Sequence, residues 1–119
     1  MSLKPFHTIG IGVTFSPNLK ANIFEASRLA VMFQSKLVLI HVGTESAEKM
    51  EQFQNILEPF IKQSLDYSIV FKAGDPVDVI LSVSEEKKIN LLILGALKRE
   101  NFLKYYVGSI ARKITRQAN

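Results

Sequence analysis

The stretch from Gly95 to Ser109 holds residue types that could bind an anion. Gly95 follows an aliphatic run, and Gly108-Ser109 precedes a predicted helix. Unpaired N–H groups at a helix start attract negative charge, and a serine hydroxyl can add one more donor. The cationic side chains of this stretch are Lys98, Arg99 and Lys104. A phosphate-bearing ligand is one interpretation; the other is that Gly95 only ends a strand and Gly108-Ser109 only caps a helix.

Other chemical signatures do not match this sequence. Gly10 and Gly12 resemble the start of a dinucleotide-binding fingerprint, but Phe15 stands where the third glycine should be. Neither a GxxxxGK[ST] phosphate loop nor a GxSxG nucleophile motif occurs, and the chain has no cysteine. His7 and His41 have no His, Asp or Glu partners at metal-ligand spacing, so we expect packing or surface roles for them. We predict no catalytic residue and no metal site.

Composition and charge predict one globular domain over residues 1–119. Of the 119 residues, 47% are hydrophobic, and no apolar run approaches the roughly 20 residues that span a bilayer. The first residues lack the apolar stretch of a signal peptide, so we expect a cytoplasmic protein without a membrane partner. The net charge of +4 is concentrated in residues 98–119, which have six basic side chains and one acidic one. This basic end is typical of a solvated helix face; nucleic-acid binding would rest on charge alone.

Hydrophobic periodicity predicts alternating strands and helices. The predicted strands are residues 6–14, 36–42, 67–72 and 90–94. Helices are predicted from Pro17, with Ser16 as its cap, to about residue 34, and from Pro76, capped by Asp75. Another helix is expected over residues 50–60, where Pro59 should kink or interrupt it, and the last follows Gly108-Ser109.

Four strand–helix units with short connections predict parallel strands with right-handed crossovers. The expected fold class is α/β, a doubly wound parallel sheet in a Rossmann-like three-layer sandwich. Ligands bind such sheets at the carboxyl ends of the strands, beside the point where the strand order reverses. The candidate binding segments are therefore residues 14–17, 42–43 and 95–109.

Four segments together resemble the universal stress protein family: residues 15–18 (FSPN), 39–42 (LIHV), 74–76 (GDP) and 91–95 (LLILG). The family's nucleotide loop is glycine, two residues, glycine, nine residues, then glycine with serine or threonine. This chain keeps the spacing with Gly95, Lys98, Gly108 and Ser109, and Lys98 replaces one glycine. The resemblance covers nearly the whole chain and implies an adenine nucleotide α-hydrolase-like fold.

The resemblance also implies a binding site for ATP or AMP. Carried over by position, the nucleotide-binding residues are Gly12, Val13, Thr14, Val42, Gly95, Lys98, Gly108, Ser109 and Ile110. Thr14 replaces the family's aspartate and substitutes a hydroxyl for a charged acceptor. Lys98 adds a side chain that either obstructs the ligand or contacts a phosphate.

The function that the resemblance implies is a stress-response module that senses or carries a nucleotide and acts through dimerisation or partner docking. The alternative is an interaction module of the same fold whose nucleotide pocket has decayed. Weak ATP hydrolysis is the most that we expect as catalysis. Family members usually have five parallel strands, and the last is missing here, so the fourth strand is expected to present an open edge. We expect a homodimer or a tandem partner domain, and this chain could be a fragment.

Overall fold

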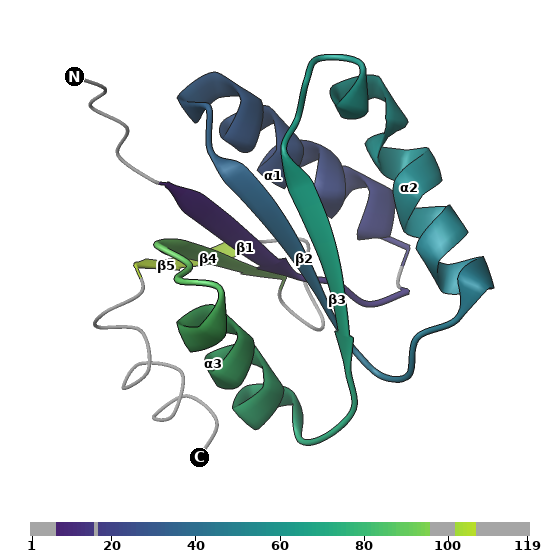
Figure 1. The fold of residues 1–119 in the computed structure, drawn as a ribbon, viewed down its shortest axis with the longest axis vertical. Helices are drawn as coiled ribbons and strands as arrows, with labels where there is room; N and C mark the ends of the chain where they lie inside the picture. Colours follow the sequence, from purple (N-terminus) through teal and green to yellow (C-terminus); the bar gives the residue numbers. More distant parts are fainter. Residues whose placement is uncertain (1–6, 16, 96–101, 107–119) are drawn as a thin grey trace.

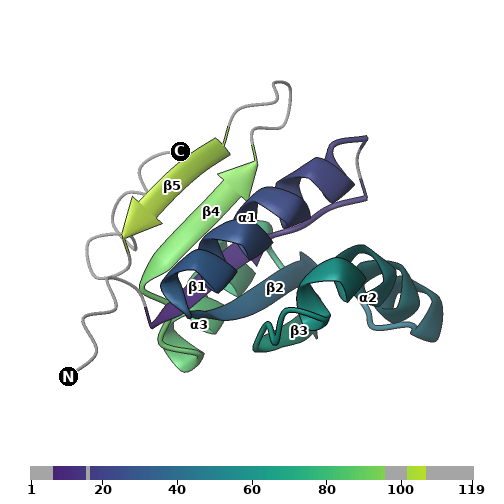
Figure 2. The same cartoon turned by 90° about the horizontal axis from the view of Figure 1, so that it is seen from above.

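The structure, a computed structural model, describes residues 7–15, 17–95 and 102–106. Four strands of its sheet are parallel, and helices cover both faces (Figures 1 and 2). The parallel strands are β1 (Thr8–Gly12), β2 (Lys36–Val42), β3 (Tyr67–Lys72) and β4 (Leu91–Gly95). The helices are α1 (Leu19–Phe33), α2 (Ala47–Ile61) and α3 (Pro76–Glu86). The prediction of a doubly wound α/β sheet is confirmed.

The strand order is β3-β2-β1-β4-β5, in which β5 (Phe102–Tyr106) pairs antiparallel with β4. The sequence interpretation treated residues 95–109 as a loop and left β4 with an open edge. The loop expectation is wrong for residues 102–106, which form β5, and the expectation of an open edge is wrong as well. β5 occupies that edge, with Gly95 opposite Phe102 and Leu91 opposite Tyr106. The predicted helix after Gly108-Ser109 lies outside the described residues.

The two faces of the sheet have separate cores. Ile9 and Ile11 of β1 are fully buried on the face covered by α1 and α2. On the α3 face, Val38 and Leu92 pack with residues of that helix. Burial on both faces explains why the central strands are nearly continuous aliphatic runs.

Local capping sets the helix starts. The Asp75 carboxylate accepts the N–H of Asp78 at 3.2 Å, and Pro76 opens α3, as predicted. α1 begins at Leu19 rather than at Pro17, and its predicted cap, Ser16, lies outside the described residues. Pro59 does not interrupt α2, which runs through it and ends at Ile61.

All three helices end in Schellman motifs, in which a residue in the left-handed conformation closes the helix. The left-handed residues are Gln34, Ser64 and Lys88, with φ values of 55°, 67° and 54°. At the end of α1, for example, Ser35 N donates to Ala30 O at 2.8 Å and Gln34 N donates to Val31 O at 3.2 Å. None of the three is glycine, so each helix end retains some backbone strain.

Candidate functional site

The carboxyl ends of β1, β2 and β4 meet at one edge of the sheet. Gly12, the last residue of β1, is paired with Ile40 of β2 on one side and with Leu94 of β4 on the other. The strand order reverses at β1. The chain runs outward from β1 to β2 and β3, and then returns to β4 on the other side of β1. This edge, which we call the carboxyl edge, is the standard ligand position in doubly wound sheets.

The last residue of β1 is a glycine, and the two residues that follow the strand are a buried valine and an exposed threonine. A Cβ on Gly12 would lie 3.2 Å from Leu94 Cδ2 and 3.6 Å from Ile80 Cδ1, so this glycine allows close packing on the α3 face. Val13 is buried and donates its N–H to Ile40 O at 2.9 Å. Thr14 is exposed directly beyond it. Of these three predicted residues, only Thr14 presents a side-chain polar group to solvent at the carboxyl edge.

His41 connects the end of β1 to an aromatic cluster. Its Nδ1 donates to the Val13 carbonyl at 3.0 Å, which means that the proton is on Nδ1, since a carbonyl only accepts. The ring is buried and contacts Phe15, Phe53 and Phe71, with centroids 5.2 to 5.7 Å away. His41 therefore packs inside the fold and holds the β1 end in place.

The main chain of Val42 faces the point where β1 has ended. Ile40 O accepts from Val13 on the β1 side, whereas Gly43 N donates to Lys72 O on the β3 side at 3.0 Å. Main-chain groups alternate direction along a strand, so those of Val42 face the β1 side. β1 ends at Gly12, opposite Ile40, two residues before Val42. The Val42 peptide groups are thus directed toward the space beyond β1, where a ligand could bond to them.

Lys49 is a cation at the carboxyl edge that sequence reasoning missed. Its Nζ donates to Thr44 O at 3.1 Å and would lie 3.7 Å from a Cβ on Gly43. The residue is half-buried in the first turn of α2, where Ser46 caps its N–H at 3.1 Å. A lysine in a first turn opposes the helix dipole. The apolar pattern places the start of this helix at residue 50, so the sequence carries no signal for this position.

A hollow at the same edge lies between β3 and α3, with a volume of about 340 Å³. Asp75 and Asp78 line it, and Lys72 Nζ donates to Ser82 Oγ at 2.9 Å beside it. Within the described ranges, no group of three or more His, Asp or Glu side chains gathers that could hold a metal ion. The hollow is thus a polar recess next to the candidate site.

The structure brings Gly12, Val13, Thr14 and Val42 to one edge of the sheet, together with Gly95 at the end of β4. The other four predicted ligand residues lie outside the described residues and stay predictions: Lys98, Gly108, Ser109 and Ile110. None of the helices in the described ranges is both long and apolar enough to cross a membrane.

Comparison with solved structures gives the same fold. A universal stress protein in complex with cAMP aligns with a TM-score of 0.67 at 15% identity, over 94% of this chain and 89% of that one. A Mycobacterium tuberculosis protein aligns at 0.66 and 21% identity, over 98% of this chain and 92% of that one. A universal stress protein from Archaeoglobus fulgidus aligns at 0.64 and 19% identity, over 92% of this chain but only 37% of that longer one. At these identities the likeness concerns the fold.

The assignment of the chain to a family rests on its sequence. No curated protein matches the chain. The model of the universal stress protein family matches residues 44–119, which is well over half of the 119 residues. The matched region includes α2, β3, α3, β4 and β5. The chain therefore belongs to the universal stress protein family.

Proposed function

We propose that this protein binds an adenine nucleotide at the carboxyl edge, between the ends of β1 and β4. The observation that carries the proposal is the direction of the Val42 peptide groups, which face the side where β1 has ended. Backbone groups at such a position can bond to the edge of a base without any particular side chain. The strand order reverses at the same point, where doubly wound sheets bind their ligands.

Two side chains at this edge would complement the nucleotide. The exposed Thr14 hydroxyl can donate to or accept from a ribose hydroxyl, although more weakly than the carboxylate usual in the family. The Lys49 ammonium supplies positive charge beside Gly43, and it donates a hydrogen bond to the neutral Thr44 carbonyl. The phosphates would bind the predicted glycine loop, formed by Gly95, Lys98, Gly108 and Ser109. The cAMP complex of a relative with the same fold also supports a nucleotide ligand.

In the proposed role, nucleotide occupancy reports a stress condition, and the protein passes the signal on in the cytoplasm by dimerisation or by docking to a partner. Hydrolysis is not part of the proposal, because a hydrolase needs a base or a metal carboxylate beside the phosphates. A tandem arrangement with a second domain of the same kind is a further form of partner. The longer Archaeoglobus fulgidus protein, of which this chain spans 37%, is consistent with that arrangement.

Isothermal titration with ATP, AMP and cAMP, paired with thermal melts, tests the proposal. Binding to the folded state alone should add about 2.7 kcal/mol of stability at a hundredfold excess over Kd. Thr14→Trp should block the site, whereas Glu86→Trp, exposed at the far end of α3, should leave binding unchanged. Lys49→Met should weaken binding more than Lys62→Met, whose ammonium is paired with Glu58 at 3.5 Å. No heat and no melting shift at millimolar nucleotide would refute the proposal.

One observation favours the second candidate, an interaction module with a decayed pocket. β5 takes five residues, Phe102–Tyr106, from the nine-residue spacer of the family's loop and pairs them with β4. A spacer held in a sheet has less freedom to wrap around phosphates. The double variant Thr14→Asp/Lys98→Gly distinguishes the candidates. If it binds ATP and the parent does not, the pocket has decayed; if both bind, the parent site works as it stands.

A further inference from the structure

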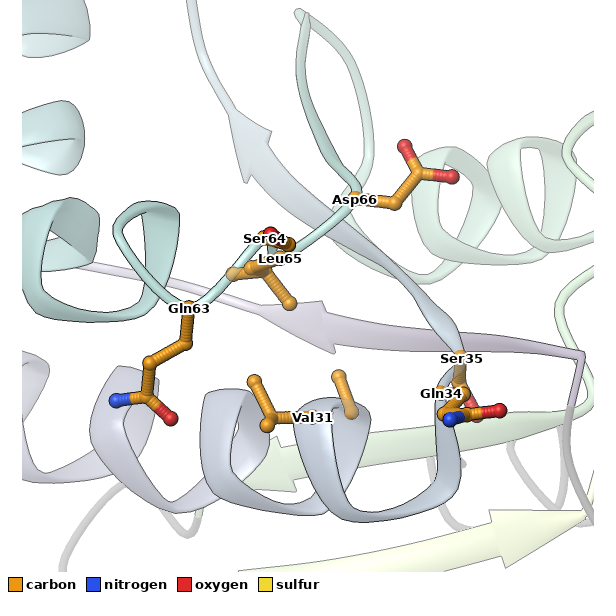
Figure 3. Close-up of a pocket in the computed structure, with 8 residues that line it drawn as sticks. Val31, Gln34, Ser35, Gln63, Ser64, Leu65 and Asp66 are labelled. Atoms are coloured by element: carbon orange, nitrogen blue, oxygen red, sulfur yellow. The ribbon is translucent and has the colours of Figure 1, made fainter.

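A pocket lies at the opposite, amino-terminal edge of the sheet, far from the strand ends that form the candidate nucleotide site. We call it the amino-edge pocket; its volume is about 390 Å³. Its apolar lining comes from Ala30, Val31 and Leu65, and its polar lining includes Gln34, Gln63 and Asp66. Figure 3 shows Gln63 and Gln34 at its two ends, with Val31 between them and Ser64, Leu65 and Asp66 along another side. A hollow of this size suits a small organic molecule.

The C-terminal ends of two helices meet at this pocket. α1 ends beside Gln34 and α2 ends beside Gln63 and Ser64, and all three residues line the pocket. Each helix end has a partial charge of about −0.5 from its carbonyls. Neither helix has a basic residue in its last turn. The two helix ends therefore direct negative potential into one hollow, and the cation at their caps is Lys62, the C-cap residue of α2.

A full negative charge adds to this potential. Asp66 is exposed on the pocket lining, and within the described part of the chain its carboxylate has no ion-pair or hydrogen-bond partner. The nearby cation Lys62 is drawn along α2 toward Glu58, with an N–O distance of 3.5 Å. Lys36 is exposed at the start of β2 and does not line the pocket. The charged group on the lining is thus an anion.

The amide of Gln63 is also oriented for a cation. Its Nε2 donates to Pro59 O at 3.3 Å, which leaves Oε1 as the available acceptor. Gln34, at the other end of the hollow, carries a second amide oxygen. The available side-chain acceptors thus surround an apolar floor formed by Val31 and Leu65. This combination fits a charged donor group attached to a short hydrocarbon chain.

We infer that the amino-edge pocket binds an organic cation, an ammonium or guanidinium group on a short apolar chain. The charged group bonds to Asp66 and to the amide oxygens of Gln34 and Gln63, and the methylenes contact Val31 and Leu65. The protein as a whole has a net charge of +4, so the attraction is local to this pocket. Anions of the same size are excluded by the same charges.

NMR titration of the whole chain tests the inference. The probes are agmatine, a small free molecule with one ammonium and one guanidinium group, and N-acetyl-lysine amide, whose single ammonium represents a protein side chain; succinate is the anionic control. We expect saturable shifts of the amide signals of Gln34, Gln63 and Ser64 with a cation and none with succinate. Tighter binding of agmatine would identify a free-amine ligand, and tighter binding of the lysine compound a protein partner. Absence of shifts with both cations would overturn the inference.

Two variants make the test specific. Asp66→Asn should weaken cation binding at least about tenfold, or 1.4 kcal/mol, whereas Asp78→Asn, an exposed carboxylate at the other edge, should not. Gln34→Lys should also abolish binding, because its ammonium would occupy the pocket in place of the ligand. Lys88 already occupies the equivalent left-handed position at the end of α3, so a lysine there is compatible with folding. Unchanged binding in Asp66→Asn and Gln34→Lys would contradict the assignment.

Discussion

Gly10 offers the sharpest test of how the α3 face of the sheet is packed. A Cβ on this residue would lie 2.5 Å from Ile89 Cδ1, 3.1 Å from Ile89 Cγ2 and 3.3 Å from Ile89 Cγ1. Ile89 is 1% exposed, so its side chain cannot move into solvent. We expect Gly10→Ala to destabilise the protein by about 1–3 kcal/mol, the usual cost of overpacking a core.

The atom that causes the clash can be removed separately. Ile89→Val deletes Cδ1, the atom at 2.5 Å, and alone should cost about 0.5–1.5 kcal/mol. In the double variant, the methyl group added at Gly10 takes up the space that Ile89→Val vacates. We therefore expect the double variant to be about as stable as Ile89→Val alone. The favourable coupling should therefore equal the cost of Gly10→Ala, about 1–3 kcal/mol, within the range for residues in contact.

Urea unfolding of the parent protein, the two single variants and the double variant measures this coupling as a double-mutant cycle, provided that the m-values agree. Gly12→Ala is the matched control. Its nearest neighbour would be Leu94 Cδ2 at 3.2 Å, the far end of a flexible side chain, so a smaller cost is expected. Additive effects of Gly10→Ala and Ile89→Val would show that contact with Ile89 is not the reason for glycine at position 10.

Further predictions concern single side chains, and each is measured by urea or thermal unfolding. Lys88→Gly should stabilise the protein by about 0.5–1 kcal/mol by relieving the left-handed residue, whereas Lys88→Ala should not. Ser27→Ala should stabilise by up to about 1 kcal/mol, since this fully buried hydroxyl has no hydrogen-bond partner among the described residues; a loss of stability would contradict this. His41→Phe should cost about 1–3 kcal/mol by leaving the Val13 carbonyl without its donor, and an unchanged midpoint would argue against that bond. Ser46→Ala should cost about 1 kcal/mol through loss of the α2 cap, and a neutral result would mean that the cap contributes nothing.

The central sheet could be predicted from the sequence because its signals are local. β2 and β3 have the bounds expected from their apolar runs, residues 36–42 and 67–72. β5 was missed for a physical reason. Its residues include Lys104 among apolar and aromatic residues, a pattern that fits an edge strand and a loop equally well. Only pairing with β4 distinguishes the two, and that contact cannot be read from residues 102–106 alone.

The candidate site was predictable where it depends on strand ends. Thr14 and Val42 follow or end apolar runs, and parallel pairing is enough to bring them to one edge. Lys49 and the amino-edge pocket were not predictable in this way. The Lys49 ammonium reaches Gly43 because α2 packs back against the sheet, and the pocket exists because two helices end side by side. Such placements depend on tertiary packing rather than on residue spacing.

The antiparallel pairing of β5 has a consequence for assembly. A second copy that joined its own sheet to β4 would first have to remove β5, together with the five residue pairs from Leu91–Tyr106 to Gly95–Phe102. Within the described part of the chain, β5 and β3 are the terminal strands of the order, so an association that keeps all five strands in place would extend the sheet beyond one of them. Association along either of those flanks would leave both proposed ligand sites uncovered by the partner strand, since these sites lie at the strand termini.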